Sequence, residues 1–311
     1  MTAVDPVAPA PPRRSAAAGM PRWSVWAWGV VGIAALVLLW ELYKWLGPSD
    51  GVVIGSERDG LRILPRTHDR AMPHVWTMVA RLFDPTSGAS TPPLWQTVTG
   101  GILTTLGIAA AGWVIGVLVG MLLALAMQRW RVAEWGLLPW IVVSQTVPLI
   151  AFAPVVSRIG NQIDRNLFPW PEWLSVAMIA SYLAFFPVAV GALRGLNAPD
   201  AIHRDLMRSY AAGYRQTLFR LRLPAAVPYL LPALRLAAAN AVVGAVVAEV
   251  SIGMRGGLGR MLLQMAQSAS ADPALPWAPI FGAVLLGLVA AGSVALLGAT
   301  MKTYRRGEAL A

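Results

Sequence analysis

The sequence predicts an all-α integral membrane protein with six transmembrane helices. Hydrophobic residues make up 57% of the chain and charged residues only 13%, whereas a soluble domain typically carries about 25% charged residues. Six apolar runs each approach or exceed the ~20 residues that cross a bilayer. Arg and Lys also gather on alternate connections between these runs. The six runs are residues 24–46, 98–127, 133–156, 173–193, 225–252 and 275–301.

The amino-terminal part of the chain predicts a tail, an anchor and an external loop. Residues 1–23 are rich in Pro and Ala, and we expect a disordered cytoplasmic tail. The run 24–46 ends in bulky residues with no small-residue cleavage site, so we expect it to remain as a transmembrane helix. Residues 47–97, with their Pro, Asp, Ser and Gly, predict an external loop before a five-helix body at 98–301.

The basic residues define the topology. They lie in the amino-terminal tail, between the second and third runs, between the fourth and fifth runs, and in the tail 302–311. These four segments fall on one side of a six-helix chain, and the positive-inside rule makes that side cytoplasmic. Both termini are therefore expected in the cytoplasm, and the formal charge of +10 reflects topology next to membrane lipid, with no nucleic-acid partner.

Prolines and polar residues interrupt two of the runs. The third and fifth runs contain prolines, so kinked or broken helices are expected there. Ionisable and amide side chains are costly inside a membrane and often mark a transport pathway. Glu249 either meets water at its helix end or lines such a pathway. The candidate pathway residues are Gln145, Pro148, Pro154, Asn240 and Glu249.

Gly112, Gly116 and Gly120 recur at four-residue spacing in the second run. This spacing places three small residues on one helix face and lets another helix backbone approach closely. We interpret it as packing inside one subunit, with a dimer contact as the alternative.

The connection 197–224 predicts an amphipathic cytoplasmic helix. Asn197, Pro199 and Asp200 provide a helix start. Such a basic amphipathic segment either lies on the anionic inner leaflet or docks against a partner protein. Apolar residues then recur every four positions, at Ile202, Leu206, Tyr210, Tyr214 and Leu218.

The stretch DLMRSYAAGYRQTLFRLRLP, from Asp205 to Pro224, resembles the cytoplasmic signature of permease subunits of binding-protein-dependent ABC importers. That signature reads Glu-Ala-Ala, three residues, Gly, nine residues, Ile-x-Leu-Pro. The alignment puts Leu206 and Met207 at the alanines and Ala211 at the glycine. Because Ala211 replaces that glycine, we expect Gly213 to supply the flexible point of the bend.

Further motifs are similar to the nitrate, sulfonate, taurine and pyrimidine-precursor importer subgroup: SQTVPLIAFAPVV from residue 144, FFPVAVGALRGL from residue 185, and AVVGAVVAE followed by GGLG. The resemblance implies a type I importer permease domain over 98–301. It also implies that the loop 197–224 carries a coupling helix seated on a cytoplasmic ABC ATPase dimer. The implied ATPase-coupling residues are Asp205, Leu206, Met207, Arg208, Ala211, Ala212, Gly213, Leu223 and Pro224.

The sequence also indicates which partners supply energy and substrate. The only lysines, Lys44 and Lys302, lack the glycine-rich context of a phosphate-binding loop, so ATP is expected on a partner and this chain is expected to be no enzyme. No catalytic, cofactor-binding or metal-binding residue is assigned. The resemblance implies an external solute-binding protein, a second permease copy in a homodimer, and the bacterial inner membrane. An ion-gradient-driven secondary transporter is the alternative.

Overall fold

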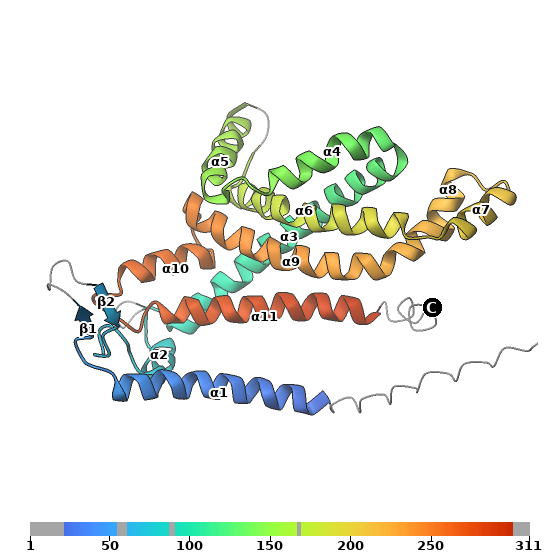
Figure 1. Ribbon diagram of the computed structural model, residues 1–311. Coiled ribbons are helices and arrows are strands. Elements are labelled where there is room, and N and C mark those ends of the chain that lie inside the picture. Colours follow the sequence, from blue (N-terminus) through green and yellow to red (C-terminus); the bar gives the residue numbers. More distant parts are fainter. Residues whose placement is uncertain (1–21, 55–60, 87–90, 167–168, 301–311) are drawn as a thin grey trace, which may run out of the picture. The chain divides into compact units, whose positions relative to one another are not determined.

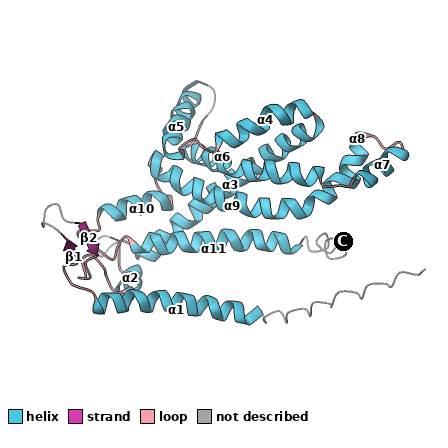
Figure 2. Cartoon of the chain, viewed as in Figure 1, coloured by secondary structure: helices cyan, strands magenta, loops and turns pink. Residues whose placement is uncertain are grey.

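The computed structural model describes residues 22–54, 61–86, 91–166 and 169–300, and the chain divides into two units, residues 1–75 and 76–311. Helices dominate both, and one short hairpin supplies the strands of the described chain (Figure 2). The first unit contains helix α1 (Arg22–Leu46) and the antiparallel strands β1 (Val52–Ile54) and β2 (Leu61–Leu64). The predicted external loop therefore holds local structure.

Two charged residues near the end of α1 organise the segment that follows the hairpin. The Lys44 Nζ donates to Asp69 Oδ1 at 2.6 Å, and the same ammonium donates to the carbonyl of Met72. The Glu41 carboxylate accepts from the backbone N–H of Val75 at 2.8 Å and lies 2.7 Å from the His74 ring. The hydrogen bond from Lys44 and its positive charge lower the pKa of Asp69. These ion pairs fold the loop back onto its own helix.

The second unit contains the remaining helices (Figure 1). Shorter helices separate the long ones along the chain. In chain order they are α2 (Val75–Ala80), η1 (Arg81–Phe83), α3 (Leu94–Arg129), α4 (Arg131–Ser144), α5 (Leu149–Asn166), α6 (Glu172–Asn197), α7 (Ala201–Ser209), α8 (Tyr214–Thr217), the π-helical η2 (Leu218–Arg222), α9 (Leu223–Ile252), α10 (Leu258–Gln267) and α11 (Trp277–Thr300).

Five described helices are long and apolar enough to cross a membrane, and the pair α4 and α5 makes a sixth if counted as one broken span. The predicted break in the third run is confirmed, because α4 and α5 meet at a bend of 106°. The Tyr182 hydroxyl of α6 donates to the Ser144 carbonyl at this break. In the fifth run, α9 continues as a helix through both Pro228 and Pro232, so neither proline breaks it.

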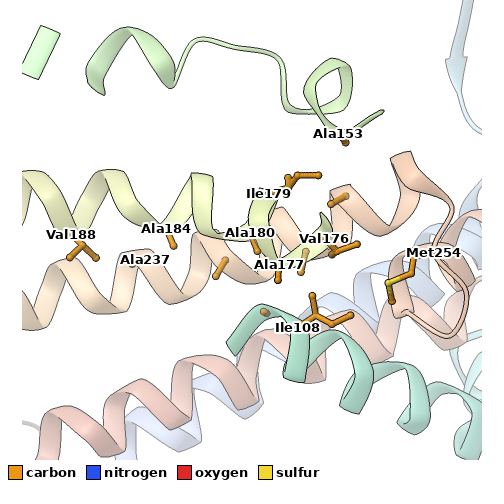
Figure 3. Close-up of a cluster of buried hydrophobic side chains, with 14 residues drawn as sticks. Ile108, Ala153, Val176, Ala177, Ile179, Ala180, Ala184, Val188, Ala237 and Met254 are labelled. Atoms are coloured by element: carbon orange, nitrogen blue, oxygen red, sulfur yellow. The ribbon is translucent and has the colours of Figure 1, made fainter. Parts of the chain in front are cut away.

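Helices α3, α6 and α9 form the core of the second unit, and small side chains let them approach closely. Figure 3 shows Ala177, Ala180 and Ala184 of α6 in this core with Ile108 of α3 and Ala237 of α9. All five side chains are buried. Interfaces of this kind depend on close van der Waals contact, since lipid offers no hydrophobic driving force between helices.

The glycine face of α3 packs against α6 within one chain, which confirms the intrasubunit interpretation. A Cβ built on Gly112 would lie 2.5 Å from the Ala180 Cβ, and one on Gly116 would lie 2.7 Å from the Ala184 Cβ. One on Gly120 would lie 2.6 Å from the Phe185 carbonyl oxygen. The two backbones are therefore in direct contact over about two helical turns.

We expect Gly116→Val to lower the free energy of unfolding by about 1–3 kcal/mol, because the added side chain overpacks a contact that includes backbone. Gly107→Val on the same helix is the matched control, since nothing lies within 4 Å of a Cβ at Gly107. The measurement is the apparent unfolding temperature of each purified variant in one detergent. Equal temperatures for the two variants would contradict the assigned contact.

Candidate functional site

The cytoplasmic signature folds as a helical hairpin that projects from the ends of α6 and α9. Helices α7 and α8 lie at the opposite end of these long helices from α10 (Figure 1). Asp200 occupies the N-cap position of α7 with an extended backbone, although its side chain makes no capping hydrogen bond. Within α7, the Arg208 guanidinium donates to Asp205 at 3.1 Å. The helix therefore starts where the sequence predicted, but Pro199 lies before its first turn and the expected side-chain cap is absent.

The predicted helix does not continue to Leu218, because a tight turn ends α7 at Ser209 and α8 begins at Tyr214. The N–H of Ala212 donates to the Met207 carbonyl and the N–H of Ala211 donates to the Arg208 carbonyl, both at 2.9 Å. These two bonds form a Schellman motif, which satisfies the free carbonyls at a helix end. The four-residue apolar pattern therefore spans two short helices.

Ala211 supplies the bend, and the expectation that Gly213 would do so is wrong. Ala211 has φ of +52°, in the left-handed region that a Schellman motif requires. Gly213 has φ of −68° and ψ of 169°, which any residue adopts. Its N–H donates to the Gln216 side chain at 3.1 Å and begins α8. The chain keeps the signature's turn at the signature's position, with a Cβ where glycine is typical.

Because a left-handed backbone is strained for an L-residue with a Cβ, we expect Ala211→Gly to stabilise this turn by about 1 kcal/mol. Amide hydrogen exchange at residues 207–213 should slow about five-fold relative to the native chain. Gly213→Ala is the control and should change exchange little, since nothing lies within 4 Å of a Cβ there. Faster exchange in Ala211→Gly would contradict the assigned strain.

Four contacts attach the base of the hairpin to the membrane helices. The Tyr214 hydroxyl donates to Gln128 Oε1 at 2.9 Å, and the Arg129 guanidinium lies 5.0 Å from the centre of the Tyr214 ring. Arg222 donates to the Leu196 carbonyl at 3.3 Å, at the end of α6. Leu218 is buried in a cluster with Leu196. These contacts hold the base of the hairpin against the ends of α3 and α6.

The nine signature residues divide into two groups. The seven between Asp205 and Gly213 lie on the projecting hairpin, where Met207 and Ala212 are half-buried and the other five are exposed. Leu223 and Pro224 instead form the first turn of α9, and Leu223 packs against the core cluster that contains Leu218. The first group can contact another protein, whereas Leu223 and Pro224 hold the base.

The five candidate pathway residues are not brought together. Gln145, at the break between α4 and α5, is half-buried and donates to the Ser144 hydroxyl at 3.2 Å, while Pro148 and Pro154 are exposed. Asn240 of α9 donates to the Leu183 carbonyl of α6 at 3.2 Å. Glu249 is completely buried and accepts hydrogen bonds from α3 and α10. Asn240 and Glu249 thus join helices to one another.

A groove of about 650 Å³ lies between α9 and α11. Arg235 is its one charged lining residue, and Ala, Val, Leu and Gly form the rest. A smaller pocket of about 280 Å³ between α3, α9 and α11 shares four lining residues with it. Apart from Arg235, nothing in the sequence indicated this groove, because small apolar residues in a membrane helix are equally typical of packing. The shared residues are Ala238, Val242, Ala290 and Val294.

Comparisons with known proteins agree with this architecture. The family model described as "Binding-protein-dependent transport system inner membrane component" matches residues 116–303. The chain is 33% identical over 207 residues to the formylaminopyrimidine transport permease protein ThiX of Halalkalibacterium halodurans, covering 65% of this chain and 76% of that protein. It is 28% identical over 176 residues to the putative aliphatic sulfonates transport permease protein SsuC of Bacillus subtilis, covering 57% and 60%.

A solved structure shares the fold. The crystal structure of an amino acid ABC transporter with histidines matches with a TM-score of 0.52 at 20% sequence identity, over 68% of this chain and 94% of that chain. At this identity the likeness concerns the arrangement of helices alone.

Proposed function

Because this chain belongs to the family of binding-protein-dependent transport system inner membrane components, we propose that its helical hairpin at residues 201–213 receives the force of a separate ATPase. The chain is the membrane-spanning permease subunit of an ABC importer, and hydrolysis of ATP takes place on a partner subunit. It is a multi-pass inner-membrane protein. Family membership excludes the alternative of an ion-gradient-driven secondary transporter.

The exposed apolar face of α7 is the observation that carries the proposal. Ile202 is 80% exposed and Tyr210 is 77% exposed, with Leu206 between them on the helix. A helix of nine residues is about 14 Å long, too short to cross a bilayer. Apolar side chains flanked by Asp205 and Arg208 suit a partner's groove with charged groups on its rim. The ATPase is the partner that the family provides.

The test uses the absence of cysteine from this chain. A single Leu206→Cys variant, co-expressed with its ATPase, should become inaccessible to a maleimide when the complex forms and remain reactive in the ATPase-free permease. Gly213→Cys is a second reporter at the other end of the turn, and Arg194→Cys, exposed at the end of α6, is the control outside the hairpin. If Leu206→Cys reacts equally fast in both states, or is shielded by vesicles alone, the hairpin does not dock on the ATPase.

We propose that two identical copies assemble, with both termini in the cytoplasm. Each chain carries one such hairpin, and an ATPase dimer offers two equivalent sites, so a symmetric pair satisfies both. An external solute-binding protein would deliver the substrate on the opposite side. The location of Arg-rich connections supports this orientation. The mass of the purified complex tests this stoichiometry. A complex with one permease copy, or with two different permease chains, would contradict the proposal.

The transport pathway is proposed to use the break at Gln145 and the groove between α9 and α11. The segment with Pro148 and Pro154 would flank it, and Asn240 and Glu249 would hold its helices in register. Arg235 would favour a small solute with an anionic group beside apolar surface. Transport by Gln145→Ala, Arg235→Ala and Glu249→Ala in reconstituted vesicles tests these roles. Wild-type rates in all three would exclude this pathway.

A further inference from the structure

A buried carboxylate joins three helices on the side of the protein remote from the hairpin. Glu249, near the end of α9, is 0% exposed. Its two oxygens accept from the Thr105 hydroxyl of α3 at 2.8 and 3.0 Å, and one also accepts from the N–H of Gly259 at 2.8 Å. The Thr105 oxygen in turn accepts from the N–H of Leu258 at 2.9 Å. These four residues form the junction of α3, α9 and α10.

In this junction the Thr105 hydroxyl both donates and accepts a hydrogen bond, and the N–H groups of Leu258 and Gly259 each have an acceptor. A hydroxyl donates one hydrogen bond and accepts others, so Thr105 can donate to the carboxylate while it accepts from Leu258. Leu258 and Gly259 are the first two residues of α10, whose N–H groups have no partner inside their own helix. The carboxyl group also lies at the positive end of the α10 dipole. Glu249 and Thr105 therefore cap α10 from two other helices.

Two glycines bring the backbone of α10 into direct contact with this cap. A Cβ on Gly257 would lie 2.3 Å from the Glu249 carboxyl carbon, and one on Gly259 would lie 2.4 Å from the Val246 carbonyl oxygen. The Arg260 guanidinium donates back to the carbonyl of Gly253, the residue that ends α9. The start of α10 is thus held to the end of α9 by backbone, carboxylate and guanidinium contacts.

The same helix leads to the hairpin at its other end. Helix α9 continues from Glu249 back to Leu223, and η2 and α8 extend the helical path to Tyr214. The 30 residues of α9 span about 45 Å at 1.5 Å per residue. One unbroken α-helix therefore connects the base of the hairpin to α10 on the far side.

We propose that Glu249 and Thr105 are positioning residues that make α10 move as one body with α9, so that displacement of the hairpin reaches the external side of the permease. This inference rests on the proposed docking of the hairpin on the ATPase. α10 presents exposed side chains at Leu263, Gln264 and Gln267. Those side chains then shift whenever the ATPase moves the hairpin, and the transport cycle couples the two sides of the membrane through one joint.

The test measures this joint directly in the reconstituted complex with its ATPase. Spin labels on Tyr229→Cys of α9 and Gln264→Cys of α10, both exposed positions, report one distance by pulsed electron resonance. In the native background we expect one narrow distribution that is unchanged between nucleotide-free and ATP-bound states. Thr105→Val keeps the side-chain shape but removes the hydroxyl, and we expect a broadened, nucleotide-dependent distribution. Thr105→Ser should restore the narrow one.

Transport supplies the second readout. The amount of solute moved per ATP hydrolysed should fall at least ten-fold in Thr105→Val and recover in Thr105→Ser. Both variants keep the fold, but only Thr105→Ser keeps the hydroxyl that bonds to Glu249 and Leu258. If Thr105→Val does not fold, Glu249→Leu, of similar size but with no hydrogen-bonding atoms, replaces it with the same expectations. A narrow, unchanged distance together with an unchanged transport ratio would overturn the proposal. Failure of the native permease to bind its ATPase would instead overturn the docking role of the hairpin.

Discussion

The double substitution Asp205→Lys with Ala211→Trp is expected to weaken binding of the ATPase by about 100-fold or more, and transport should be lost with it. The lysine reverses the charge beside Arg208, with which Asp205 pairs at 3.1 Å. The tryptophan puts a bulky ring at a left-handed position in the projecting turn. Mismatched charges and steric overlap at the centre of an interface commonly cost several kcal/mol, and each 1.4 kcal/mol is ten-fold.

The measurement is co-purification of the ATPase with tagged permease, followed by titration of ATPase onto permease in nanodiscs. Glu134→Lys makes the same change of charge at the start of α4, outside the hairpin, and should bind the ATPase normally. Membrane insertion of the double variant should equal that of the native chain, because the hairpin contributes little to the buried core. Undiminished association would exclude the docking role.

Gly259→Ala is expected to destabilise the permease by about 3 kcal/mol, near the upper end for overpacked sites. A Cβ at this position would lie 2.4 Å from the Val246 carbonyl oxygen and 3.0 Å from the Glu249 Cβ. The first of these atoms belongs to the backbone of α9, which cannot turn aside as a long side chain can. α10 would have to leave its cap, and two buried N–H groups would lose their acceptors.

The measurement is the unfolding temperature of each variant, taken from the fraction of protein that remains monodisperse after heating. Gln264→Ala, at an exposed position on the same helix, should shift the unfolding temperature little, since surface changes usually stay within about 0.5 kcal/mol. A Gly259→Ala variant as stable as Gln264→Ala would mean that α10 does not pack against α9 as described.

The sequence predicted features that arise from local pattern. Apolar run length located the membrane helices, and Pro148 indicated the break between α4 and α5, because a proline removes a helical hydrogen bond. The spacing of Gly112, Gly116 and Gly120 indicated a contact face. Each of these signals resides within a few turns of one helix, so no partner had to be known.

Features that depend on distant partners escaped prediction. Thr105 is unremarkable in an apolar run, and its bond to Glu249 joins residues 144 positions apart. For Glu249 the sequence left open water contact or a pathway role, and a structural cap was not among the alternatives. The turn at Ala211 was misplaced because backbone propensity favours glycine, whereas the capping bonds of the whole turn decided the position. Tertiary contacts overrode local preference in both places.

The contact between α3 and α6 limits where this protein can change shape. Backbones that touch through glycine and alanine have no rotamers to exchange, so this pair lacks the alternative packings that sliding between helices requires. α4 differs, because Ile141 is the single buried side chain along its length. We therefore expect α3 and α6 to move as one body during transport, whereas α4, which meets α5 at the bend of 106°, can change its position relative to them.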